Sequence, residues 1–212
     1  MEKIKWGIIG PGNIANNFAD GLTNSYSGQL VSIASKSEDR RKNFGDKYDI
    51  HPDFRFDSYE DIINSEHIDA IYISTPHNLH AEWTIKAAGK GKHVLCEKPG
   101  AVNLNEGKKI IEAVKEAGVF YMEGFMYRCH PQIPKLLEII KNKTIGEIES
   151  IETSFGYDTG KTIPESRIFN KELTGGAILD VGLYPISFSR LISGVALSLI
   201  HISEPTRQFA IS

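Results

Sequence analysis

The sequence is poor in cysteine, lacks long apolar runs and carries no excess of positive charge. Its two cysteines, Cys96 and Cys129, are too few for a disulfide framework or a paired metal site, so we expect a reducing compartment. No stretch approaches the roughly 20 apolar residues of a membrane helix, and the N-terminus has no signal-peptide core. A net charge of −3 offers no field that attracts nucleic acid. We therefore expect a cytoplasmic protein without nucleic-acid or membrane partners.

The remaining composition, 41% hydrophobic and 24% charged, is typical of a globular protein. In the first half of the chain short apolar runs alternate with amphipathic segments, which predicts βαβ units and a parallel sheet with helices on both faces. Strands are predicted at Ile4 to Ile9, Leu30 to Ser35, Ala70 to Ser74, His93 to Cys96 and Val119 to Met122. Helices are predicted at Ile14 to Leu22, Glu38 to Tyr48, Tyr59 to Asn64, Ala81 to Ala88 and Leu104 to Ala117. Asn103 and Glu106 have the spacing of a capping box before the last of these helices.

The pattern changes after Glu123, which predicts a first domain over residues 1–123 and a second over residues 124–196. In the second domain, Pro134 to Lys141 has the spacing of a helix. Ile145 to Phe155 alternates between apolar and polar residues and resembles an antiparallel strand.

A glycine-rich turn follows the first predicted strand and begins a helix, in the G-x-G-x-x-G/A pattern of dinucleotide-binding Rossmann domains. Gly10 permits the tight turn, Gly12 lets the backbone approach a pyrophosphate, and small Ala15 lets helix and strand pack closely. The helix N-terminus then faces the phosphates. The predicted cofactor contacts here are Gly10, Gly12, Asn13, Ile14 and Ala15. A glycine turn with a purely structural role is the alternative.

The residue that follows the second strand decides which dinucleotide fits. An acidic side chain that binds a ribose 2′-hydroxyl is absent there, and Ser35, Lys36 and Arg40 suit a 2′-phosphate instead. We therefore predict NADP(H) in preference to NAD(H). The alternative is a solvated helix face whose charges are balanced by Glu38 and Asp39.

Two further segments place polar groups at the carboxyl edge of the predicted sheet. After Ser74, the turn with Thr75 and Pro76 is predicted to lie along the ribose and nicotinamide. His80, at the start of the next helix, is a further predicted cofactor contact. His77 and His80 do not make a metal site, because no further ligand has suitable spacing. We predict no metal.

The second of these segments, Glu97-Lys98-Pro99, follows the strand His93 to Cys96, and Glu97 and Lys98 are predicted cofactor contacts. An ammonium group held there can stabilise developing oxyanion charge and lower the pKa of a neighbouring phenol or alcohol. A surface lysine paired with Glu97 is the alternative.

Asp180 and Tyr184 are four residues apart in a glycine-rich segment and would share one face of a helix. A tyrosine beside a cation is a suitable base for a substrate hydroxyl during oxidation, and it returns the proton during reduction. The segment could instead be an ordinary helix with a core tyrosine.

Together these motifs resemble the glucose-fructose oxidoreductase and inositol dehydrogenase family, called Gfo/Idh/MocA, and especially its dihydrodiol or xylose dehydrogenase-like branch. The most specific parts are Glu97-Lys98-Pro99, the stretch Met122 to Arg128, and Asp180-x-Gly182-x-Tyr184. The resemblance implies an α/β protein. Its N-terminal Rossmann domain, a doubly wound parallel sheet, would be followed by an incomplete α+β domain with a mostly antiparallel sheet.

The resemblance also implies roles for individual residues. Tyr184 would be the general acid/base, Lys98 would tune it and orient substrate, Asp180 would position hydroxyl groups, and Arg128 would contact substrate or the domain junction. The implied reaction is hydride transfer between NADP(H) and a small sugar-like, polyol or dihydrodiol substrate, in a homo-oligomer. Gly100 departs from the family pattern, in which a larger apolar residue is common.

The last segment, residues 197–212, does not fit the family. Leu197 to Arg207 reads as the translation of a transposase adapter used in shotgun DNA sequencing, and Gln208 to Ala210 would span its index. We expect a non-native tail and a natural protein that continues differently after about Ala196.

Two other functions remain open. One is a redox-neutral glycosidase or lyase that uses the nicotinamide transiently, and the other is a noncatalytic NADP(H)-binding sensor. Lys98, Asp180 and Tyr184 argue against the sensor, because binding alone does not require them.

Overall fold

The computed structural model describes residues 2–160, 163, 165–166 and 168–195. These residues form two compact units: residues 2–125 with the described residues between 163 and 180, and residues 126–160 with 181–195. The predicted non-native tail, residues 197–212, lies outside the described residues. No helix in the described ranges has the length and apolar character needed to span a membrane.

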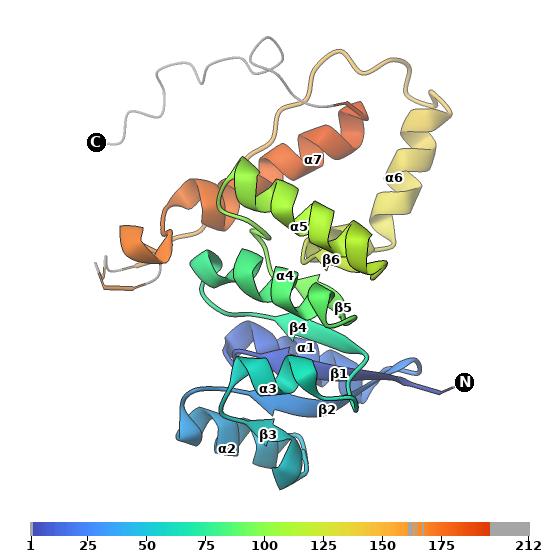
Figure 1. Cartoon of the computed structure of the whole chain (residues 1–212). Helices are drawn as coiled ribbons and strands as arrows, with labels where there is room; N and C mark the ends of the chain where they lie inside the picture. The colour runs from blue at the N-terminus through green and yellow to red at the C-terminus, as the bar shows by residue number, and fades with distance from the viewer. Residues whose placement is uncertain (1, 161–162, 164, 167, 196–212) are drawn as a thin grey trace. The chain divides into compact units, whose positions relative to one another are not determined.

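The first unit is built on a six-stranded sheet in the order β3-β2-β1-β4-β5-β6 (Figure 1). The strands are β1 (Ile4–Ile9), β2 (Gly28–Ala34), β3 (Arg55–Phe56), β4 (Ala70–Ile73), β5 (His93–Cys96) and β6 (Tyr121–Glu123). Every neighbouring pair is parallel. The strand order changes direction beside β1, so the carboxyl ends of β1 and β4 flank the crevice where doubly wound sheets bind ligands. This topology confirms the predicted Rossmann-type α/β fold.

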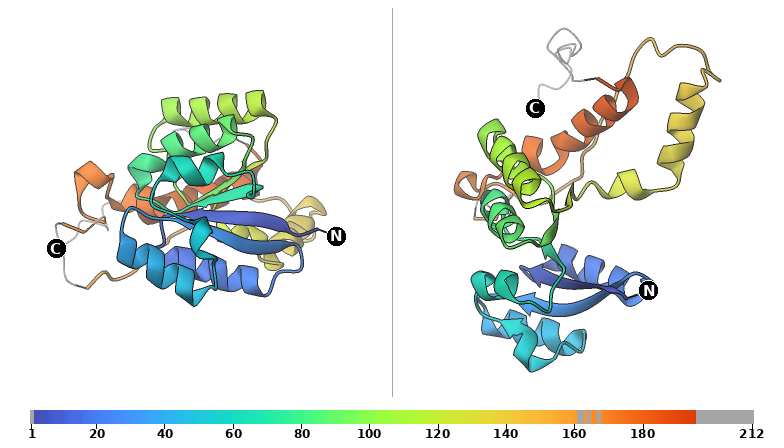
Figure 2. Two further views of the ribbon diagram at one scale, coloured as in Figure 1. Left: turned by 60° about the horizontal axis from the view of Figure 1, so that its bottom comes forward. Right: turned by 45° about the vertical axis from the view of Figure 1, so that its right-hand side comes forward.

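Helices cover both faces of this sheet, as Figure 2 shows. The helices are α1 (Asn13–Thr23), α2 (Glu38–Lys47), α3 (Tyr59–Asn64), α4 (His80–Gly89) and α5 (Leu104–Ala117). On one face Ala15 and Phe44 bring α1 and α2 into a buried cluster with Ile8 and Ile33. On the other face α3 and α4 contribute to a second cluster that includes fully buried Ile71. Two apolar cores thus hold the strand ends in place.

Helix α5 begins at the N-cap Asn103 that the sequence predicts, while Glu106 bonds the Asn103 side chain and the amide of the residue before it. The Asn103 side chain accepts a hydrogen bond from Glu106 N at 2.9 Å, and the Glu106 carboxylate accepts from Asn103 Nδ2 at 2.9 Å and from Val102 N at 3.2 Å. We expect Asn103→Ala to lower the free energy of unfolding by about 0.5–2 kcal/mol, because a first-turn amide loses its acceptor. Urea denaturation measures the change, with Asn103→Asp as the control that keeps the acceptor. An unchanged midpoint for the alanine variant would contradict this role.

The second unit contains the 3₁₀ turn η3 (Met126–Cys129), α6 (Gln132–Lys141) and α7 (Leu183–Ser193). The predicted antiparallel strand at Ile145 to Phe155 is not formed, since no residue from 145 to 160 belongs to a strand. A strand needs a neighbour that pairs its amides and carbonyls, and the described residues of this unit supply none. Alternation alone therefore gave a wrong prediction for this stretch.

Candidate functional site

The turn between β1 and α1 has the geometry of an anion-binding loop. Gly10 has a φ of +90°, and a Cβ there would lie 3.0 Å from the Ser74 carbonyl oxygen, so the position requires glycine. At Gly12 a Cβ would meet no non-neighbouring atom of the described residues within 4 Å. Packing therefore does not explain Gly12, whose missing side chain leaves open space before the helix. This open space is what the predicted approach of a pyrophosphate to the backbone requires.

Helix α1 offers its N-terminus to that space. It has no side-chain cap and no acidic residue in its first turn, so its first backbone amides can donate to an anion. Asn13 is exposed, Ile14 is 40% exposed, and Ala15 is fully buried against the sheet. Ser74 Oγ donates to the Gly10 carbonyl at 2.7 Å and ties the end of β4 to the turn. These features suit a dinucleotide pyrophosphate.

The segment after β2 presents two cations, Lys36 and Arg40, near the sheet edge. Arg41 Nη1 donates to the Ser35 carbonyl at 2.6 Å, so Arg41 fixes the loop. The Lys36 ammonium lies 5.7 Å from the centre of the Tyr59 ring. In the described part of the chain, neither Lys36 nor Arg40 forms an ion pair. This arrangement favours anion binding over a face of internally balanced charges.

The turn after β4 contains a buried hydroxyl group that suits a bound ligand. Thr75 is 7% exposed, and its Oγ1 has no hydrogen-bond partner among the described residues. Pro76, the next residue, is exposed. Buried hydroxyl groups normally have a partner, so this one needs an explanation, and the predicted contact of Thr75 with the ribose or nicotinamide stays a prediction.

His80, which the sequence predicts as a cofactor contact, is instead 1% exposed beneath the loops. Its Nδ1 lies 2.7 Å from the Pro99 carbonyl oxygen and its Nε2 lies 2.8 Å from that of Thr75. The pKa of His80 is lowered, mainly because the ring is buried. The two carbonyls and the Glu97 and Glu123 carboxylates offset part of this shift. His80 therefore joins the loops that follow β4 and β5, and its predicted contact with the cofactor stays a prediction.

Lys98 and Asp180 form a buried pair within the first unit. Lys98 Nζ donates to the Asp180 carbonyl at 2.6 Å and to its Oδ1 at 3.2 Å. The Lys98 side chain is 16% exposed and the Asp180 side chain 7%. Asp180 lies in a π-helical turn, η5 (Ile178–Gly182), and such turns are frequent at functional sites. The structure thus brings together two of the three predicted catalytic residues.

Glu97, also a predicted cofactor contact, makes internal hydrogen bonds. Its Oε1 accepts from the Tyr72 hydroxyl at 2.6 Å, and its Oε2 accepts from Lys98 N at 3.3 Å. At the other end of the loop that starts with Glu97, Glu123 Oε1 accepts from Gly100 N at 2.7 Å. Tyr72 and Glu123 were not among the predicted site residues. The loop from Glu97 to Gly100 is thus held at both ends by a carboxylate.

Arg128 and Tyr184 lie in the second unit. Tyr184 belongs to α7, and Arg128 contacts that helix at Ser187. Arg128 Nη2 donates to Ser187 Oγ at 3.3 Å, and the Tyr127 hydroxyl lies 2.8 Å from the same oxygen. The Tyr184 ring is 5.1 Å from that of Phe155, between centroids. Asp180 belongs to the first unit and Tyr184 to the second. The expectation that they share one helical face therefore stays a prediction.

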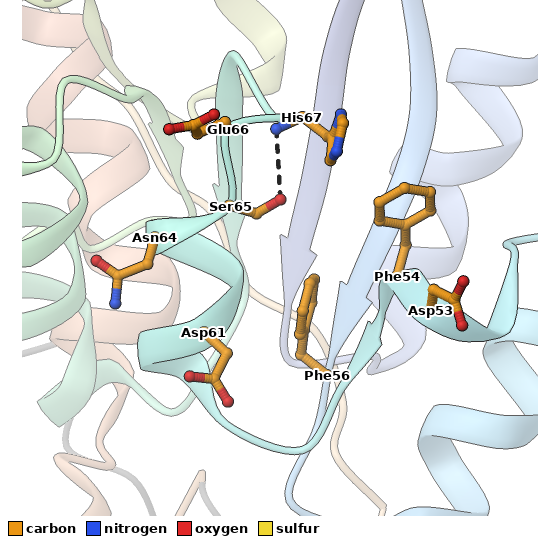
Figure 3. Close-up of a pocket in the computed structure, with 8 residues that line it drawn as sticks. All are labelled: Asp53, Phe54, Phe56, Asp61, Asn64, Ser65, Glu66 and His67. Carbon is orange, nitrogen blue, oxygen red and sulfur yellow. Dashed lines mark hydrogen bonds between the residues drawn. The ribbon is translucent and has the colours of Figure 1, made fainter.

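Figure 3 shows a separate pocket in the first unit, near β3 and α3. Its walls are Asp53, Phe54, Phe56, Asp61, Asn64, Ser65, Glu66 and His67. None of these residues belongs to the predicted site. Among the described residues, no three His, Cys, Asp or Glu side chains are grouped closely enough to hold a metal ion.

A parallel doubly wound sheet, a glycine turn that requires its glycine, and an uncapped helix behind it define a Rossmann-type nucleotide-binding protein. A family model described as an oxidoreductase family with an NAD-binding Rossmann fold matches residues 4–125. A second model, the GFO/IDH/MocA C-terminal domain, matches residues 133–203. The chain belongs to the Gfo/Idh/MocA oxidoreductase family.

Named relatives and a solved structure agree with this assignment. The trans-1,2-dihydrobenzene-1,2-diol dehydrogenase of Xenopus laevis is 34% identical over 89% of this chain and 56% of that enzyme. D-xylose 1-dehydrogenase (NADP(+)) 2 of Haloferax volcanii is 32% identical over 95% of this chain and 61% of its own length. A 3-ketoreductase from Actinomadura kijaniata, solved with TDP-benzene and NADP, aligns with a TM-score of 0.75 and 33% identity over 90% of this chain and 56% of that one. The chain therefore spans between 56% and 61% of the length of these proteins.

Proposed function

We propose that this protein is an NADP(H)-dependent oxidoreductase that transfers a hydride between the nicotinamide and a sugar-like, polyol or dihydrodiol substrate. The observation that carries the proposal is the buried pair of Lys98 and Asp180, in the same unit as the glycine turn. In this pair the carboxylate holds the ammonium in place, and a fixed ammonium can stabilise negative charge that develops on a reacting oxygen. The names of the dihydrodiol and xylose dehydrogenases support the same reaction class.

The cofactor would be held by the features at the sheet edge. Gly12 and the first amides of α1 would bind the pyrophosphate, Lys36 and Arg40 the 2′-phosphate, and the turn at Thr75 the ribose or nicotinamide. When bound, NADP(H) supplies or accepts the hydride. The cofactors in the relatives' names support NADP(H) over NAD(H).

The protein's own residues would move the proton. The Lys98 ammonium would donate a hydrogen bond to the reacting oxygen, and Asp180 would hold that ammonium and bind substrate hydroxyls. The Tyr184 phenol would remove the substrate's hydroxyl proton in oxidation and return it in reduction. Arg128 would orient the substrate.

The cofactor preference can be tested by fluorescence titration of NADPH and NADH into the full chain. We expect tighter binding of NADPH, and Lys36→Asp should reduce its preference over NADH by about 10–100-fold, as for loss of one charged hydrogen bond. Lys42→Asp makes the same charge change on α2 and should leave the preference unchanged. Equal effects of the two variants would contradict a 2′-phosphate site at Lys36.

The reaction class can be tested with D-xylose and trans-1,2-dihydrobenzene-1,2-diol as probes. An oxidoreductase forms NADPH in proportion to product. Product without net change in NADPH would indicate a redox-neutral enzyme. Binding of NADPH without product from a panel of sugars, polyols and diols would favour a sensor and contradict the proposal.

A further inference from the structure

We infer that Tyr72 is a positioning residue of the candidate active site, acting on Lys98 through the Glu97 carboxylate. The inference deepens the proposed function, since it depends on Lys98 having the catalytic role given above. Tyr72 does not need to touch substrate or cofactor to have this effect. It determines where the Lys98 backbone lies.

Tyr72 is a polar residue within an otherwise apolar strand. It is 2% exposed on β4, between the fully buried Ile71 and Ile73. Its ring stacks on Phe18 of α1, with centroids 4.1 Å apart and an angle of 22° between the ring planes. Phenylalanine would fill this space equally well, and a buried hydroxyl costs free energy unless it is hydrogen-bonded. The hydroxyl therefore points to a specific partner.

That partner is Glu97, at 2.6 Å from the Tyr72 hydroxyl. The second carboxylate oxygen of Glu97 accepts from Lys98 N, so one rigid carboxylate joins the tyrosine to the lysine backbone. Glu97 N donates to the Ile73 carbonyl at 2.9 Å, which fixes the start of the loop to the end of β4. With its carboxylate oriented by Tyr72, Glu97 restricts the backbone from which the Lys98 side chain reaches Asp180.

The electrostatics agree with a permanent hydrogen bond rather than a proton relay. Burial and the nearby Glu97 carboxylate raise the pKa of Tyr72, so its phenol keeps its proton and acts as the donor. Its contribution is to geometry, and small displacements of a catalytic group are costly in rate.

Tyr72→Phe tests the inference because it removes the hydroxyl and keeps the ring on Phe18. In a ¹⁵N-labelled full chain we expect the Lys98 amide signal to move and its hydrogen exchange to become about tenfold faster, as for loss of a hydrogen bond of about 1.4 kcal/mol. Turnover of D-xylose or the diol should fall by a similar factor, with the affinity for NADPH unchanged. Tyr48→Phe is the matched control, since the Tyr48 hydroxyl donates to the Asp20 carboxylate at 2.8 Å elsewhere in the same unit.

Glu97→Ala provides a second measurement that does not depend on the tyrosine variant. It should move the Lys98 amide in the same way, and Tyr72→Phe should have no further effect on that amide in the Glu97→Ala background. A Lys98 amide that is unchanged in Tyr72→Phe or in Glu97→Ala overturns the inference, whatever the activity. If the amide moves as expected but the unaltered protein does not turn over NADP(H), the proposed function fails and the structural link remains.

Discussion

Lys98→Met is expected to reduce turnover by about 10²–10³-fold, the usual effect of removing one donor to a developing oxyanion. The same change removes the Lys98 ammonium from the Asp180 carboxylate, which is 7% exposed. Breaking a buried pair from one side costs about 3–5 kcal/mol, so the variant should also be less stable. Steady-state kinetics by NADPH absorbance and urea denaturation measure the two effects separately.

A second substitution separates catalysis from folding at this pair. In Lys98→Met/Asp180→Asn the carboxylate charge is removed together with the ammonium, so stability should recover in part while turnover should not. Recovery of turnover together with stability would show that Lys98 contributes only to the fold.

Tyr184→Phe is expected to lower turnover by about 10²–10⁴-fold, since it removes a general acid/base, while binding of NADPH is retained. The ring remains, so its packing against Phe155 should persist and the stability should change little. Steady-state kinetics with D-xylose or the diol, with parallel NADPH titration, measure the split between rate and binding.

Tyr127→Phe is the control for this variant. It removes a phenol hydroxyl from the same unit, one that lies 2.8 Å from Ser187 Oγ, without removing a proposed proton donor. Comparable losses of turnover in the two variants, or full activity of Tyr184→Phe, would contradict the role given to Tyr184.

Much of the first unit could be predicted because its signals are local. The strands Ile4–Ile9 and His93–Cys96 and the helix Leu104–Ala117 have the predicted bounds. Short apolar runs and a capping box identify them without knowledge of their neighbours. The two-residue strand Arg55–Phe56 was missed, because a segment of this length shows no period.

The site was predictable only where a motif marks it. The glycine turn and Lys98 could be identified from their position after a strand, and the structure supports the geometry expected of each. Tyr72 was missed because it reads as one more residue of a buried strand. Its contact with Glu97 joins positions 25 residues apart, and no local pattern reports such a pair.

The glycine at position 100, in the loop after Lys98, is explained by the side chain that lies beside it. A Cβ at this position would overlap the phenol oxygen of Tyr121, which reaches across from β6. The space that a larger apolar residue occupies in the family pattern is thus filled here by a side chain from another strand. A side chain at position 100 therefore requires the Tyr121 ring to move or to be replaced by a smaller side chain.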